Sequence, residues 1–277
     1  MKLYLSADME GTAGVASWAQ CDPKNTTEYP YYRHLMSLEV RAAIDGAREA
    51  GVKDVLVNDS HSAMRNVLWN ELPDDVRMIY GNRKPFSMNE GIDQSFACAF
   101  FTGYHAGVGD ADGALDHTYS PDTIYNVRLN GTRCSETTMN AALLGYHGVP
   151  VALISGDRTT VEGARAFLPW IEGVVSKDSI GRYAVNSFSP AEVRERLRAG
   201  ATRAIERVAE MKPFRFASPL TLEIDFTGTQ NADFAELIPG FARSGGRSVR
   251  FQHDDYAVVF KAFVAAMRLG AAANAPV

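Results

Sequence analysis

The sequence has little cysteine, no long apolar run and no concentration of basic residues. Three cysteines (Cys21, Cys98 and Cys134) occur among 277 residues, too few and too scattered for a disulfide framework or a paired-cysteine zinc site. No run of 18 apolar residues occurs, so no membrane span is predicted. The formal net charge is −5 without a basic patch, which argues against a nucleic-acid partner.

These absences favour a globular protein of a reducing compartment. An odd number of cysteines suits a reducing compartment, and the first residues lack the basic and apolar regions of a secretory signal. Hydrophobic residues make up 46% and charged residues 22%, as in ordinary globular proteins. We therefore expect a cytoplasmic protein that has neither a membrane nor a nucleic acid as its partner.

The first 160 residues alternate between short apolar runs and helical segments. Residues 32–50 place apolar side chains on one helix face, between strand-like runs at residues 3–7 and 52–57. Such a unit predicts two parallel strands joined by a right-handed crossover. Buried strands are also predicted at residues 97–102 and 150–155. The sequence thus predicts an α/β fold of Rossmann-like type, with a mostly parallel sheet flanked by helices.

The pattern changes near residue 185. A charged helix is predicted from Pro190 to about Met211, and two strands and a final helix are predicted at residues 219–226, 247–253 and 254–269. We therefore expect two domains, a metal-binding α/β domain over residues 1–185 and a smaller α+β domain over residues 186–277. Between the strands of the first part, the sequence predicts a helical piece at 91–97 and a hairpin turn at Asn130-Gly131.

Residues of the kinds that bind metals follow three of the predicted strands. Asp8 and Glu10 follow the first strand, His61 follows the second, and His105 follows the strand at 97–102. Because the carboxyl ends of parallel strands meet at one edge of a sheet, these side chains are expected together. Glu136, at the start of a predicted helix, could join them.

The donor types favour zinc, with manganese or cobalt as alternatives. Two histidines and three carboxylates exceed the needs of one tetrahedral zinc, so the number of donors suggests two ions with a bridging carboxylate. Two such ions can hold a hydroxide between them and polarise a carbonyl or phosphoryl group. Each residue also has an explanation that involves no metal. The aspartate and the first glutamate can cap a turn, the histidines can be hydrogen-bonded structural residues, and Glu136 can interact with a helix dipole. The recurrence at three strand ends favours the metal site.

Three further residues are candidates for supporting roles. His117 fits a proton donor or an oxyanion-stabilising group better than it fits a metal ligand. Asp59 and Asp157 are candidates for orienting the ligating histidines, although turn capping explains them at least as well.

Several short motifs, in this order along the chain, resemble the D-aminopeptidase family of dipeptide-transport operons. The resemblance covers residues 1 to about 160 and implies a dinuclear zinc aminopeptidase with a Rossmann-like core, assembled as a ring-shaped decamer of stacked pentamers. The motifs are Ser6-Ala7-Asp8-Met9-Glu10-Gly11, Asn58-Asp59-Ser60-His61, Lys84-Pro85-Phe86-Ser87-Met88, Gly103-Tyr104-His105 and Ser155-Gly156-Asp157.

By motif position, the resemblance implies a role for each candidate. Asp8 would bridge two zinc ions, with Glu10 and His61 on one ion. His105 and Glu136 would bind the other ion, and His117 would be catalytic. The expected function is then removal of an N-terminal D-residue, such as D-alanine, from short peptides by a hydroxide that bridges the metals.

Two other functions are compatible with the residues. A metal-dependent phosphoesterase is one, since aspartate and histidine at strand ends also serve phosphoryl transfer. A non-enzymatic ring-forming protein is the other, and its metal would be structural, with a closed coordination shell.

Overall fold

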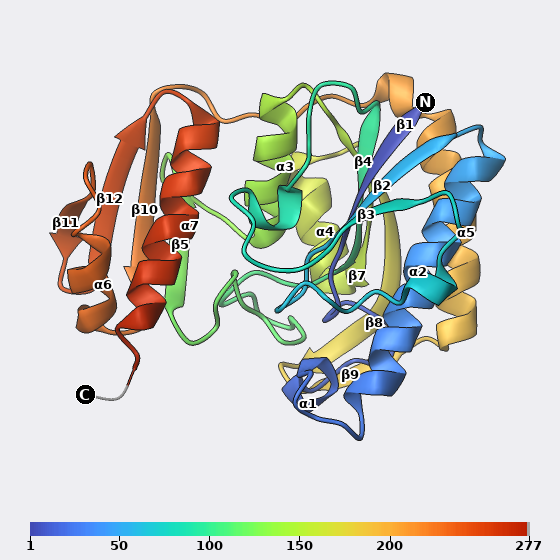
Figure 1. Cartoon of the computed structure of the whole chain (residues 1–277), viewed down its shortest axis with the longest axis horizontal. Coiled ribbons are helices and arrows are strands. Elements are labelled where there is room, and N and C mark those ends of the chain that lie inside the picture. The colour runs from blue at the N-terminus through green and yellow to red at the C-terminus, as the bar shows by residue number, and fades with distance from the viewer. Residues whose placement is uncertain (276–277) are drawn as a thin grey trace.

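The computed structural model of the chain describes residues 1–275 and contains two sheets (Figure 1). In sheet A, neighbouring strands are parallel except at one edge, where the last pair is antiparallel. Its strand order is β3 (Arg77–Ile79), β2 (Asp54–Asp59), β1 (Lys2–Ala7), β4 (Cys98–Tyr104), β7 (Val151–Asp157), β8 (Glu172–Gly181) and β9 (Ala184–Ser187).

Helices cover both faces of sheet A. Helices α2 (Tyr29–Glu49) and α5 (Pro190–Glu206) pack on each other over one face, and α3 (Glu136–Tyr146) and α4 (Arg158–Phe167) lie on the other (Figure 1). Successive residues of a strand therefore enter different cores: Leu3 and Leu5 pack with α2, whereas Tyr4 packs with α3 and α4. This two-sided burial explains why the strands are almost continuously apolar.

Sheet B is antiparallel and has one covered face. The alternation of β10 places Leu220, Leu222, Ile224 and Phe226 in a core beneath α6 (Thr229–Ala235) and α7 (Tyr256–Ala272). Helix α7 also contacts α3, where the Tyr256 hydroxyl donates to the Met139 carbonyl at 3.0 Å. The strand order is β11 (Ala242–Gly245), β12 (Ser248–His253), β10 (Leu220–Phe226), β5 (Ile124–Leu129) and β6 (Thr132–Arg133).

Most of the predicted elements are confirmed, and the exceptions have local causes. The helical piece predicted at 91–97 is wrong, because Gly91 has a φ of 82°, in the left-handed region that an α-helix does not use. A short 3₁₀ helix, η2 (Ser87–Asn89), precedes it. The helix that begins at Pro190 ends at Glu206, before another 3₁₀ helix, η3 (Val208–Glu210).

The two sheets do not divide the chain at residue 185. The β5–β6 hairpin precedes that position but belongs to sheet B, where β5 pairs with β10. Helix α5 follows that position but packs on α2 over sheet A. The mixed α/β fold is confirmed, whereas the division into domains 1–185 and 186–277 stays a prediction about folding units. Among the residues described, no helix combines the length and apolar character needed to cross a bilayer.

Candidate metal centre

The carboxyl ends of β1, β2 and β4 bring the predicted site residues into one buried cluster. Since β1 pairs in parallel with both β2 and β4, Asp8, His61 and His105 leave sheet A at the same edge. Glu10 lies on the turn after β1, and Glu136 is the first residue of α3. The six residues predicted from the sequence are each at most 6% exposed: Asp8, Glu10, His61, His105, His117 and Glu136.

Asp8 lies between two histidine–carboxylate pairs. Its Oδ1 is 3.4 Å from His61 Nδ1, and its Oδ2 is 3.5 Å from His105 Nε2. The same His61 nitrogen is 3.0 Å from Glu10 Oε2, and the same His105 nitrogen is 3.3 Å from Glu136 Oε1. One carboxylate is thus shared between a Glu10–His61 pair and a His105–Glu136 pair.

Each histidine of the cluster directs one ring nitrogen at a backbone carbonyl. His61 Nε2 donates to Cys21, His105 Nδ1 to Ala106, and His117 Nδ1 to Leu115, each at 2.9 Å. A carbonyl can only accept, so this nitrogen carries the proton of a neutral ring, and the second nitrogen, which faces the carboxylates, is then free to bind a metal ion. His105 Nε2 is buried and makes no hydrogen bond of good geometry. Oriented imidazole nitrogens beside carboxylate oxygens fit zinc.

His117 joins the cluster by stacking on His105. Their ring centroids are 3.8 Å apart with an angle of 9° between the planes, and the Trp18 ring contacts His117 edge-on at 5.2 Å. His117 Nε2 lies 3.6 Å from Glu136 Oε1 and 4.0 Å from Glu10 Oε1. Burial, and next the charge of His105, lower the pKa of His117, which keeps its ring neutral.

Burial and mutual charge set the ionisation of the other groups. Burial raises the pKa of Asp8 to about 7, and the charge of Glu10 acts in the same direction. Burial also opposes ionisation of Glu10, but the histidines, His61 first, outweigh it and lower its pKa. Burial would lower the pKa of His105, but Glu136 outweighs burial and raises it to about 10. Three buried carboxylates that surround the same histidines require nearby positive charge.

Close backbone packing brings Asp8 near His105. The Gly11 N–H donates to the Gly103 carbonyl at 2.8 Å. A Cβ on Gly11 would lie 1.9 Å from the backbone carbonyl oxygen of Tyr104. A Cβ on Gly103, whose φ is 68°, would lie 2.2 Å from the backbone carbonyl oxygen of Asp8. Only glycine allows the turn after β1 to lie directly on the end of β4.

A buried lysine organises the turn that carries Glu10. Lys177 of β8 is 0% exposed, and its ammonium donates to the carbonyls of Glu10, of Thr12 at 2.9 Å and of Val15 at 2.7 Å. All three of its donors are therefore used. The local sequence does not mark Lys177 as a site residue, because a single lysine in a strand is far more often exposed.

Two neighbouring side chains complete the support of this turn. The Ser176 hydroxyl donates to the Gly11 carbonyl at 2.5 Å, and Glu39 of α2 accepts the Ala13 N–H at 2.9 Å. Glu39 is 2% exposed, and its second oxygen, Oε2, has no hydrogen-bond partner. Burial raises the pKa of Glu39 to about 7, although the hydrogen bond from Ala13 opposes this shift.

Asp59 and Asp157 do not orient the ligating histidines directly. Asp59 accepts the Asn66 N–H at 2.5 Å, and Asn66 Nδ2 donates to the His61 carbonyl at 2.7 Å, so Asp59 acts on the loop backbone. Asp157 is the N-cap of α4 and accepts the Thr160 N–H at 2.8 Å. The capping alternative is confirmed for Asp157.

The cluster opens into a cavity of about 790 Å³. All of the predicted site residues except His105 line it, together with side chains of the loops at the edge of sheet A and Arg268 of α7. A volume of this order accommodates a small ligand or a short peptide.

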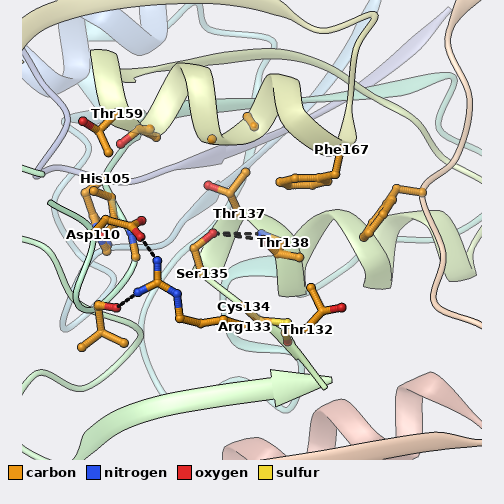
Figure 2. Close-up of a pocket in the computed structure, with 17 residues that line it drawn as sticks. His105, Asp110, Thr132, Arg133, Cys134, Ser135, Thr137, Thr138, Thr159 and Phe167 are labelled. Carbon is orange, nitrogen blue, oxygen red and sulfur yellow. Dashed lines mark hydrogen bonds and ion pairs between the residues drawn. The ribbon is translucent and has the colours of Figure 1, made fainter. Parts of the chain in front are cut away.

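A second, smaller pocket of about 230 Å³ also reaches His105 (Figure 2). It lies between α4, which carries Thr159 and Phe167, and the first turn of α3, which carries Thr137 and Thr138 (Figure 2). Its arginine, Arg133, is paired with Asp110 and also donates to the Val108 carbonyl at 3.0 Å. None of the other predicted site residues lines this pocket.

Removing the Lys177 charge tests its role in shaping the centre. In Lys177→Met, three buried carbonyls lose their donor, and we expect zinc affinity to fall on the order of 10- to 100-fold. The measurement is a chelator-competition titration with the folded protein. Asn231→Ala is the control, since Asn231 is equally buried but lies in the α6 region, where its Nδ2 donates to the Gly270 carbonyl. Equal zinc affinity in Lys177→Met and the wild type would contradict this role.

Glu39 makes the stability of the protein depend on pH. The pKa of Glu39 is about 7 in the folded state against 4.5 in the unfolded state. The unfolded chain therefore ionises first as the pH rises, so the free energy of unfolding of the wild type decreases as the pH rises from 4.5 to 7. We expect Glu39→Gln to be more stable than the wild type at pH 8 by up to roughly 3 kcal/mol, with no gain at pH 4.5. Urea unfolding at both pH values measures this, and a pH-independent difference would be the contrary result.

Comparisons with known proteins show the family to which the chain belongs. The family model for Peptidase_M55, described as D-aminopeptidase, matches residues 1–265. A D-aminopeptidase of Bacillus subtilis (strain 168) is 34% identical over 268 residues, 95% of this chain and 96% of the relative. The solved structure of the Zn-dependent D-aminopeptidase DppA from Bacillus subtilis, described as a self-compartmentalizing protease, has a TM-score of 0.94 and 32% identity, and the match covers 98% of each chain. The resemblance seen in the motifs is confirmed: the chain belongs to the D-aminopeptidase family.

Proposed function

We propose that the chain is a zinc-dependent aminopeptidase that removes an N-terminal D-residue, such as D-alanine, from short peptides. The observation that carries the proposal is the position of Asp8 between the Glu10–His61 and His105–Glu136 pairs. The family match over residues 1–265 and the zinc-dependent relative support it.

The donors suit two zinc ions. Asp8 would bridge them, with Glu10 and His61 on one ion and His105 and Glu136 on the other. Bound zinc supplies a water of lowered pKa and polarises the scissile carbonyl. A hydroxide bridging the two ions stays a prediction.

His117 is the residue to which we assign proton transfer. Its Nδ1 donates to Leu115, so Nε2 is left to accept a proton from the attacking water. Burial of the ring lowers the pKa of His117, which favours the unprotonated form of this nitrogen. The same nitrogen can then protonate the leaving amine, while stacking on His105 fixes the plane of the ring.

We propose further that the chain works as a cytoplasmic homo-oligomer, a decamer of stacked pentamers. The description of the DppA relative as self-compartmentalizing supports an assembly. Large apolar side chains lie at the surface for such contacts, among them Ile180 at 71%, Leu237 at 72% and Tyr183 at 60% exposure.

A chelator-controlled assay tests the activity. We expect the zinc-loaded protein to hydrolyse D-Ala-D-Ala, to lose activity with a chelator and to regain it with zinc, while L-Ala-L-Ala and an aryl phosphate remain nearly uncleaved. Cleavage of the phosphate ester alone would replace the peptidase with a phosphoesterase. Bound zinc without turnover of any of the three compounds would favour a structural metal.

Removing the His117 imidazole separates catalysis from metal binding. We expect His117→Ala to keep its zinc content and to lose kcat on the order of 10²-fold or more. Metal analysis and steady-state kinetics measure the two effects, with His253→Ala, an exposed histidine of β12, as control. Unchanged kcat would refute the catalytic role, and lost zinc would make His117 a ligand.

A further inference from the structure

The cavity beside the metal-site residues has a cationic side chain that the proposed reaction does not yet use. Arg268 projects from α7 and lines the same cavity as Asp8 and Glu10. Its Nη2 donates to Asn82 Oδ1 at 3.3 Å, and Asn82 Nδ2 donates to the Ser62 carbonyl at 3.1 Å. Since Ser62 directly follows His61, a single side chain links Arg268 to the loop of the metal centre.

The positive charge of Arg268 has no counter-ion in the described part of the chain. The other arginine of the cavity, Arg182, pairs with Asp116 at 3.0 Å, whereas Arg268 makes no ion pair with a carboxylate within residues 1–275. Partial burial, and next the charge of Arg83, lower the pKa of Arg268, but a guanidinium stays ionised at neutral pH. An uncompensated charge in a ligand cavity favours an anionic group on the ligand.

We propose that Arg268 binds the C-terminal carboxylate of the peptide, so that the enzyme selects short peptides with a free C-terminus. This inference rests on the proposed function. An aminopeptidase holds the first peptide bond at its centre, and the remaining residues extend away by at most about 3.5 Å each. In a cavity of about 790 Å³, the C-terminus of a dipeptide or tripeptide therefore stays inside, where a guanidinium can bind it through two parallel hydrogen bonds.

The smaller pocket at His105 offers no equivalent group. Its arginine, Arg133, is already paired with Asp110 (Figure 2), so a carboxylate entering there would have to displace an existing partner. Of the two pockets, the larger one thus has in its lining an arginine, Arg268, that is unpaired within residues 1–275.

The test compares D-Ala-D-Ala with its C-terminal amide on the zinc-loaded, full-length protein. In the wild type, we expect KM for the amide to exceed KM for the acid about tenfold. In Arg268→Gln, we expect KM for the acid to rise about tenfold while KM for the amide changes less than twofold and kcat for both is nearly unchanged. Arg268→Lys keeps the charge without the planar fork, and its KM is expected between the two.

The matched control is Arg165→Gln, which removes an exposed arginine of α4 that does not line this cavity. We expect its two KM values to equal those of the wild type. Equal KM for acid and amide in the wild type, equal losses on both substrates in Arg268→Gln, or an equal effect of Arg165→Gln would each overturn carboxylate recognition and leave the aminopeptidase intact. Failure of the zinc-loaded wild type to cleave either compound would overturn the proposed function together with this inference.

Discussion

The contact between the turn after β1 and the end of β4 is the constraint on which the candidate centre depends. The Gly11–Gly103 hydrogen bond and the absence of a Cβ at both positions allow the two backbones to approach. This approach puts Asp8 within 3.5 Å of His105. A Cβ on Gly11 would push the turn, and with it Asp8, away from His105.

Charge burial is the second constraint. Three carboxylates are buried in one cluster. Burying an ionised carboxylate costs free energy unless an opposite charge lies nearby. In the metal-free protein, histidines of raised pKa supply that charge. In the proposed enzyme, zinc would supply it. Lys177 and Glu39 are two more buried ionisable groups, and both hold the turn that carries Glu10. The rigidity of the centre thus comes at a cost in stability, which is typical of functional sites.

The local sequence pattern predicted much of the metal centre and of the secondary structure. Asp8, His61 and His105 were expected together because parallel strands end at one edge, and they are together. The helix expected at 91–97 failed because the apolar pattern does not show that Gly91 is left-handed. Lys177 escaped notice because its burial depends on carbonyls up to 167 positions away.

By itself, the sequence determined the alternation of strands and helices, the edge of the sheet at which the site lies and the types of donor there, since each follows from spacing along a few residues. Only the tertiary structure decided which histidine faces which carboxylate, that the β5–β6 hairpin pairs with β10 rather than with sheet A, and that Arg268 of α7 lines the same cavity as Asp8. These features arise from contacts between segments far apart in the chain, and the local spacing of residues does not encode them.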